Sequence, residues 1–150
     1  VLFLLGIQVF GFQCVAIDGG AAELTWSLRT FGGDPVDEDR CLEDAFVEKV
    51  RLCWNAVDSG ATGCRPGNFR DFDCQDQTGE TLFEIEPGRT AFFVLPICED
   101  GQPARVGTYQ APPEIVREVR DGEVVSLESL LITVTDHPNS CGPECTCVRE

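Results

Sequence analysis

The chain has 150 residues, enough for one domain with a hydrophobic core, and its 43% hydrophobic and 25% charged residues argue against wholesale disorder. The formal net charge is −15 and is spread along the chain, so it repels nucleic-acid phosphates and anionic lipid headgroups. We therefore expect no nucleic-acid partner, and we interpret the acidic surface as a source of solubility rather than a binding site.

Cysteine is the most informative residue type. The chain has nine cysteines, no methionine and a single histidine, His137, which is far from cytosolic usage. Thiols at this density persist as disulfides in an oxidising compartment or as metal ligands. A zinc site usually shows paired C-x-x-C motifs, and this sequence has none. Disulfides are therefore predicted, and no metal or cofactor is.

The N-terminal segment, residues 1–13, is an uncharged apolar run of signal-peptide length, too short to span a bilayer as a helix. Cys14 follows at once, an arrangement that resembles a bacterial lipoprotein signal, in which this cysteine is lipidated. Residues 11–13 (GFQ) depart from the residues that such a signal prefers. Two alternatives stay open: cleavage after Ala16, which gives a secreted protein, and retention of the segment as an apolar first strand.

Short strands separated by turn signals follow in the first half. Alternation of apolar and polar residues predicts strands at 22–29, 50–54 and 69–74. A single helical turn is predicted at 41–47, and no sustained helical periodicity occurs elsewhere. Residues 55–68 are rich in glycine and small polar residues and are predicted to form a loop.

The second half continues the pattern. A turn is predicted at 76–79, followed by strands at 81–86 and 91–97. The second of these strands is apolar on both faces, so it should be central in its sheet or buried against something on its second side. Residues 115–120 and 123–135 flank an Asp-Gly pair, the strongest hairpin signal in the chain.

These patterns predict an all-β fold. A sandwich and a barrel both fit, and we predict an antiparallel two-sheet sandwich of about seven strands, stapled by disulfides. The expected organisation is a signal peptide or hydrophobic segment at 1–13, a linker at 14–21, the sandwich at 22–136 and a cysteine-rich tail at 137–150.

Parity of the cysteines supports export, since eight remain for pairing once Cys14 is set aside. The predicted disulfide-forming residues are Cys41, Cys53, Cys64, Cys74, Cys98, Cys141, Cys145 and Cys147. Cys64 and Cys74 bracket a short loop and are easily joined, and Cys41 is expected to pair with Cys98 or Cys53. At least one cysteine of the tail should be tied back to the sandwich.

One stretch carries a family resemblance. Phe83 and Ile85 alternate up to a Pro87-Gly88 corner, which a second apolar strand follows up to Val94. Proline ends ladder pairing and glycine takes the positive φ of the turn. This stretch resembles the prealbumin-like (transthyretin or carboxypeptidase-regulatory-like) sandwich domains of exported bacterial proteins, and residues 122–134 resemble their closing strand. The resemblance implies a structural, adhesive or carbohydrate-proximal accessory role; the whole chain resembles a small cysteine-rich bacterial lipoprotein.

The sequence offers little catalytic chemistry. His137 precedes a proline, and no G-x-S-x-G motif accompanies it, so we expect no enzyme and no catalytic residue. Trp26 and Trp54 lie at strand spacing and are predicted to be core residues. Two acidic clusters have some potential for calcium but lack the EF-hand register, and we interpret them as solvated surface. They comprise Asp34, Asp37, Glu38 and Asp39, and Asp71, Asp73 and Asp76.

We therefore predict a non-catalytic exported protein of the cell envelope (outer membrane, periplasm or cell surface) or a secreted one, with a structural or protein-interaction role. The expected partners are other envelope or surface proteins, and the membrane through a lipid on Cys14. The alternative is an accessory module that binds carbohydrate or a cation. An exposed edge strand favours the first function, and exposed tryptophans beside carboxylates favour the second.

Overall fold

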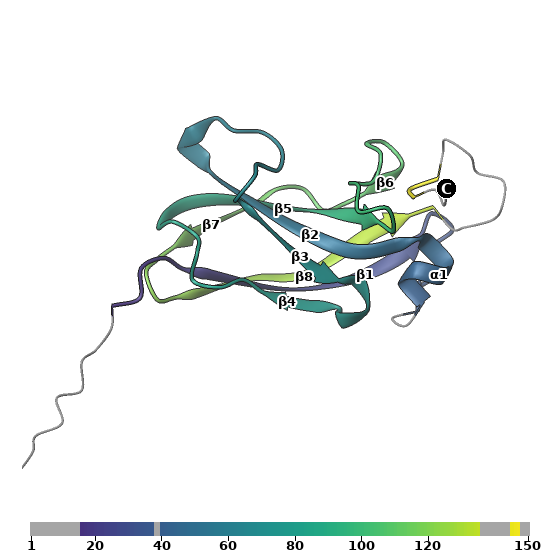
Figure 1. Cartoon of the computed structure of the whole chain (residues 1–150), viewed down its shortest axis with the longest axis horizontal. Coiled ribbons are helices and arrows are strands. Elements are labelled where there is room, and N and C mark those ends of the chain that lie inside the picture. Colours follow the sequence, from purple (N-terminus) through teal and green to yellow (C-terminus); the bar gives the residue numbers. More distant parts are fainter. Residues whose placement is uncertain (1–15, 38–39, 136–144, 148–150) are drawn as a thin grey trace, which may run out of the picture.

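The computed structural model describes residues 16–37, 40–135 and 145–147. The prediction of an all-β two-sheet sandwich is confirmed, with eight strands in two four-stranded sheets (Figure 1). The elements are β1 (Ala21–Thr30), α1 (Cys41–Ala45), β2 (Val47–Ala56), η2 (Val57–Ser59), β3 (Phe69–Asp73), η3 (Cys74–Asp76), β4 (Thr78–Glu80), β5 (Gly88–Cys98), β6 (Tyr109–Gln110), β7 (Ile115–Val119) and β8 (Val124–Val134). Within the described ranges, no helix is long and apolar enough to cross a membrane.

The two sheets have the strand orders β4-β1-β8-β6 and β3-β2-β5-β7. Every pair of neighbouring strands is antiparallel except β1 and β8, which run parallel from Ala21 beside Val124 to Thr30 beside Val134. In Figure 1 β1, β4 and β8 form the lower layer, and β2 and β5 lie in the layer above them. The first and last strands of the sandwich therefore close against each other.

The core lies between the sheets and follows the predicted alternation. Leu24, Trp26 and Leu28 of β1 are buried, as are Leu52 and Trp54 of β2. Burying one such side chain stabilises the fold by about 1.5–3 kcal/mol. The strand expected to be central is β5, which pairs with β2 on one side and β7 on the other.

The Asp-Gly turn does not form the predicted hairpin. Gly122 takes a positive φ of 69° in a tight turn, but β7 pairs with β5 and β8 pairs with β1, so the chain crosses between sheets. The N–H of Gly122 donates to the carbonyl of Gly19, 2.9 Å away. An Asp-Gly pair therefore sets the sharpness of the turn, whereas long-range pairing decides the sheet that each strand joins.

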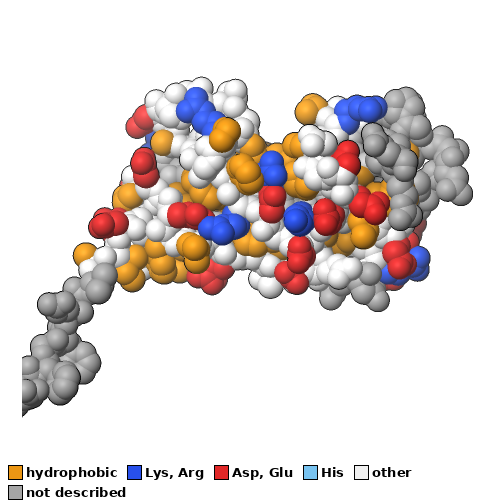
Figure 2. Space-filling model, in the orientation of Figure 1, with side chains coloured by type: hydrophobic (Ala, Val, Ile, Leu, Met, Phe, Trp, Pro, Cys, Tyr) orange, Lys and Arg blue, Asp and Glu red, His pale blue; other side chains and the backbone are white. Residues whose placement is uncertain are grey.

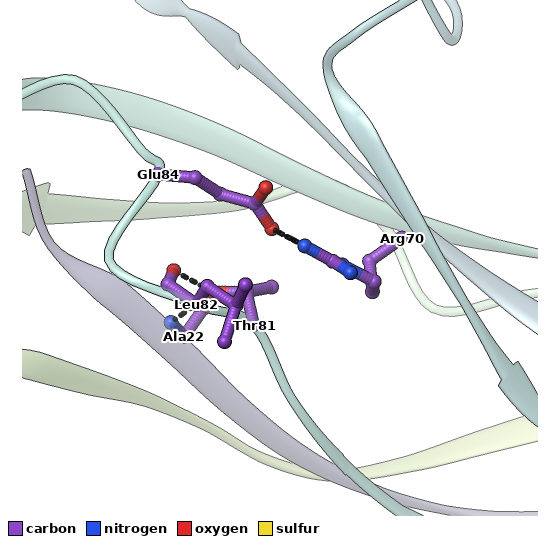
Figure 3. A network of polar contacts seen from close by, with 5 residues as sticks. All are labelled: Ala22, Arg70, Thr81, Leu82 and Glu84. Carbon is purple, nitrogen blue, oxygen red and sulfur yellow. Dashed lines mark hydrogen bonds and ion pairs between the residues drawn. The ribbon is translucent and has the colours of Figure 1, made fainter.

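The predicted strand at 81–86 is also wrong, as is the turn at 76–79. Strand β4 occupies Thr78–Glu80, and the following residues cross from β4 to β5 with only a bridge between Ile85 and Gly20. The hydroxyl of Thr81 accepts the N–H of Ala22 (2.9 Å) and donates to the carbonyl of Leu82 (3.0 Å), as Figure 3 shows. These bonds fix residues 81–87, here named the crossing segment, to β1.

Three disulfides join pairs of described residues that are 33, 11 and 49 residues apart. Cys41 at the start of α1 pairs with Cys74 in η3, Cys53 of β2 with Cys64, and Cys98 of β5 with Cys147. The predicted Cys64–Cys74 bond and the pairing of Cys41 with Cys98 or Cys53 are therefore wrong. The first of these predictions used proximity along the chain, whereas the observed partners are set by how the strands pair.

The tail is tied to the sandwich, as expected, by the Cys98–Cys147 bond. Cys145 is disulfide-bonded as well, and Thr146 is buried with its hydroxyl donating to the carbonyl of Thr108, 2.7 Å away. Residues 145–147 therefore pack as part of the domain, beside the end of β8.

Candidate functional site

Both sheets leave a strand edge open on the same side of the sandwich. Strand β7 ends its sheet and pairs only with β5, and β6 pairs with β8 only at Thr133 and Val134. Among the described residues, positions 124–132 of β8 therefore have a strand neighbour, β1, on one side alone. β7 and β8 lie beside each other across the two layers, since Arg117 reaches from one to the other.

The backbone hydrogen-bonding groups of β7 alternate in direction. The N–H of Trp54 donates toward β3, and Trp54 lies opposite Phe92, which in turn lies opposite Ile115. The N–H and C=O of one strand residue point to the same side, and two residues that face each other across an antiparallel pair either both bond to each other or both point away. Trp54 points away from β5, so Phe92 points away from β2 and toward β7, where it bonds to Ile115. Val116 and Glu118 therefore direct their N–H and C=O groups away from the sheet.

Arg117 covers part of these open edges. Its Nε donates to the carbonyl of Ser126 on β8 (3.3 Å), and its Nη1 donates to the carbonyl of Val116 (3.2 Å). Its Nη2 lies 3.5 Å from the carboxylate of Glu128, whose side chain is 81% exposed, so this ion pair contributes little to stability. One guanidinium thus occupies a carbonyl on each edge, and a charged side chain of this kind discourages edge-to-edge pairing.

A groove of about 440 Å³ runs along the two edges, here named the β7–β8 groove. A bulge in β8, where Glu128 takes a positive φ of 65°, shapes one wall. Val116, which lines the groove, is 39% exposed. Its apolar lining residues are Pro112, Pro113, Ile115, Val116, Leu127 and Leu130, and its charged ones are Glu114, Arg117 and Glu128.

A second hollow, of about 290 Å³, lies where β2 extends beyond its pairing with β3. We name it the Asn55 cleft. Trp54, Asn55 and Ala56 of β2 line it together with Thr90 of β5. Its two walls are the loop between β2 and β3, which carries Ser59, Arg65 and Asn68, and the crossing segment, which carries Glu84, Ile85 and Glu86.

Covalent and polar bonds fix both walls of the Asn55 cleft. The Cys53–Cys64 disulfide and a hydrogen bond from Asn55 Nδ2 to the carbonyl of Gly63 (2.9 Å) hold the loop against β2. Glu84 forms an ion pair with Arg70 of β3 at 2.6 Å, which ties the crossing segment to the opposite sheet (Figure 3). Bonds within the chain therefore hold both walls of the cleft.

The two tryptophans lie in the core, as predicted, and not on the surface. Trp26 is 2% exposed and its Nε1 donates to the carbonyl of Cys74, 3.1 Å away. Trp54 is 5% exposed, although it contributes to the wall of the Asn55 cleft. Neither offers the flat exposed ring that stacks on a sugar.

The acidic side chains either bond to arginine or are spread over the surface. Both carboxylate oxygens of Asp71 accept bonds from Arg51, at 2.6 and 2.8 Å, and this bond raises the pKa of Arg51. The Arg51 guanidinium also lies 3.9 Å from the ring centre of Phe69. In Figure 2 acidic side chains are scattered between basic ones over the visible face. No group of three or more His, Cys, Asp or Glu in the described part of the chain is arranged to hold a metal ion.

Several predicted residues lie outside the described ranges, namely Cys14, Glu38, Asp39, His137 and Cys141. Conversely, sequence reasoning missed Arg117 and Asn55. Asn55 is a polar residue directly after an apolar run, which is a weak signal of its own, whereas nothing local distinguishes Arg117 from the other surface arginines. Comparisons with protein-family models, with curated proteins and with solved structures gave no match.

Proposed function

We propose that this protein is a non-catalytic exported protein that binds an extended segment of another protein in the β7–β8 groove. The observation that carries the proposal is the pair of open strand edges on one side of the sandwich. Glu118 offers an outward-facing N–H and C=O, and Val116 offers an outward-facing N–H while its carbonyl bonds to Arg117. An added strand uses such groups as hydrogen-bond partners.

The groove also offers specificity. Because side chains of an added strand alternate between two faces, one face would meet the apolar wall formed by Ile115, Leu127 and Leu130. The other face would meet solvent beside the exposed Val116 side chain. We therefore expect a partner segment in which apolar residues alternate with polar ones.

Charge selects among such segments. The groove is lined by two negative side chains, Glu114 and Glu128, and by one positive side chain, Arg117. Glu118 adds a further negative charge on β7. The whole chain carries −15, so a second copy of this protein is repelled. The occupant that fits is a segment of a different protein whose polar positions are lysine or arginine.

The cellular location is part of the proposal. Three disulfides between described residues, and a disulfide-bonded Cys145, support an oxidising compartment. We place the protein in the cell envelope or the extracellular space, with Cys14 as the proposed lipid attachment. The prealbumin-like relationship of residues 82–94 belongs to the same proposal and is supported by the sandwich, although only the second of its two expected strands, β5, forms in the structure.

Binding of designed peptides tests the proposal. We would titrate the protein with a short peptide of alternating valine and lysine, with its valine–glutamate twin, and with a version interrupted by proline. The lysine peptide should bind roughly tenfold more tightly than the glutamate twin, because the groove is acidic. The proline version should not bind, since proline cannot supply the backbone donors of a strand.

A matched pair of variants locates the site. Val116→Lys adds a cation on β7 beside the groove and should weaken binding of the lysine peptide. Val106→Lys makes the same change in the loop between β5 and β6, at a valine that is 90% exposed, and should have no effect. Equal binding of the lysine and glutamate peptides, or equal effects of the two variants, would refute the assignment of this groove.

A further inference from the structure

Exposed apolar side chains gather at the end of the sandwich where β1 begins. In Figure 2 such side chains lie at the lower left of the visible face, beside the first described residues. Half of the eight large hydrophobic residues that are exposed among the described residues belong to this end, here named the apolar tip. They are Ile17 (50% exposed), Leu82 (66%), Phe83 (37%) and Val124 (43%).

Backbone contacts bring the segments of the apolar tip together. Gly20 and Ile85 exchange two hydrogen bonds, of 2.9 and 3.1 Å, which place the crossing segment beside the start of β1. A carbon added to Gly19 would lie 2.9 Å from the carbonyl oxygen of Phe83. Val124 is the first residue of β8, which starts beside the start of β1. Three separate segments therefore carry the four apolar residues to one end of the molecule.

The position of Cys14 in the sequence indicates what covers the apolar tip. Cys14 comes three residues before Ile17, and three residues span at most about 11 Å. A lipid on Cys14 would therefore hold the surface of a bilayer within that distance of Ile17. Exposed apolar side chains so close to a bilayer are stabilised when they enter the boundary between its headgroups and acyl chains.

The charges beside the apolar tip select the kind of lipid. Asp18 lies just before the start of β1, and Asp121 accepts the N–H of Gly19 at 2.8 Å. Arg120, the cation of the same turn, lies 3.6 Å from Glu123. Three carboxylates thus accompany one guanidinium, so an anionic surface is repelled and a neutral one is favoured.

We propose that the apolar tip contacts a neutral lipid surface, with Leu82 and Phe83 in the lipid, so that the sandwich stands on this end. The inference rests on the lipid attachment at Cys14 that is part of the proposed function. It also leaves the β7–β8 groove open to a partner, because the groove is lined by residues 112–117 and 127–130 and runs along the strands.

Quenching of tryptophan fluorescence by brominated lipid tests the proposal. Leu82→Trp, made in the full chain, places a reporter in the apolar tip, and the native Trp26 and Trp54 give a constant background because they are 2% and 5% exposed. On phosphatidylcholine vesicles, brominated lipid should lower the reporter's emission roughly twofold or more, and vesicles rich in phosphatidylglycerol should give less quenching. The matched control is Val106→Trp, 90% exposed in the loop between β5 and β6 at the other end (Figure 1), and it should not be quenched.

Two further measurements separate this inference from the lipid attachment. Intact mass shows whether Cys14 carries a lipid, and a hexahistidine tag at the N-terminus holds the chain on nickel-chelating lipid whether or not it does. With the Leu82→Trp reporter, Ile17→Glu should weaken the quenching severalfold. Phe31→Glu, which changes an equally exposed residue just beyond the far end of β1, should leave the quenching unchanged.

The outcomes distinguish the two proposals. Quenching of the tagged form when Cys14 carries no lipid would refute the lipid attachment and support the contact of the apolar tip with lipid. The contact is overturned if neither form is quenched, as when residues 1–13 or another protein cover the tip. It is also overturned by equal quenching of Val106→Trp, by stronger quenching on phosphatidylglycerol, or by equal effects of the two glutamate variants.

Discussion

Removal of the Cys41–Cys74 disulfide is expected to cause the larger loss of stability when compared with removal of Cys53–Cys64. The first bond joins α1 to η3 across 33 residues, and its two cysteines are 2% and 1% exposed. Cys74 also supplies the carbonyl that accepts the indole N–H of Trp26. The bond therefore closes a long segment of chain directly beside the core.

The magnitude follows from the entropy of the unfolded chain. The chain-entropy model gives about 4 kcal/mol for a separation of 33 residues and about 3 kcal/mol for the 11-residue separation of Cys53–Cys64. Replacing Cys41 and Cys74 by alanine also leaves a small cavity, which adds about 1 kcal/mol. A loss of about 4–5 kcal/mol is a large part of the 5–15 kcal/mol that a typical domain has.

Urea unfolding followed by tryptophan fluorescence measures both effects. The Cys41→Ala/Cys74→Ala variant should unfold at a much lower urea midpoint, with a larger m-value because the unfolded chain is less constrained. The Cys53→Ala/Cys64→Ala variant should lose about 1–2 kcal/mol less. If the second variant loses as much stability as the first, or more, the reasoning from loop length is refuted.

Three further predictions concern single sites. Gly79→Ala should destabilise the protein by about 1–3 kcal/mol, because the added carbon would lie 2.6–2.8 Å from the ring of Phe72; Gly32→Ala meets only ordinary contacts and should be nearly neutral, and similar urea midpoints would contradict this. Arg117→Ala should change stability by less than about 1 kcal/mol yet increase affinity for the lysine peptide, since it frees two edge carbonyls; lower affinity would contradict the covering role. Burial raises the pKa of Tyr109, the chain's one tyrosine, so stability should be full below pH ~10 and decline above it; phenolate absorbance that titrates at or below the ordinary tyrosine pKa would contradict this.

Local pattern was enough to predict much of the fold. The alternation of Leu24, Trp26 and Leu28 with polar residues placed β1 within a residue at each end, because a period of two has only one explanation in a short apolar segment. The doubly apolar run at 91–97 correctly indicated a central strand, because β5 lies between β2 and β7.

Long-range pairing could not be predicted from the same patterns. The residues around Gly122 have the chemistry of a hairpin turn, yet the parallel pairing of β8 with β1 separates the flanking strands into two sheets. Disulfide partners depend on the same register, which is why Cys74 is joined to Cys41 rather than to Cys64. The outward direction of the Val116 N–H likewise follows from the pairing of β2, β5 and β7, which local sequence does not reveal.

The central claim is that the β7–β8 groove accepts an added strand, and residue-resolved hydrogen–deuterium exchange tests it most directly. In the protein alone, the amides of Val116 and Glu118 should exchange quickly, whereas that of Arg117, which bonds to β5, should be protected. Saturation with the valine–lysine peptide should slow exchange at Val116 and Glu118. Unchanged exchange at these two amides, with the peptide bound, would contradict strand addition at this edge.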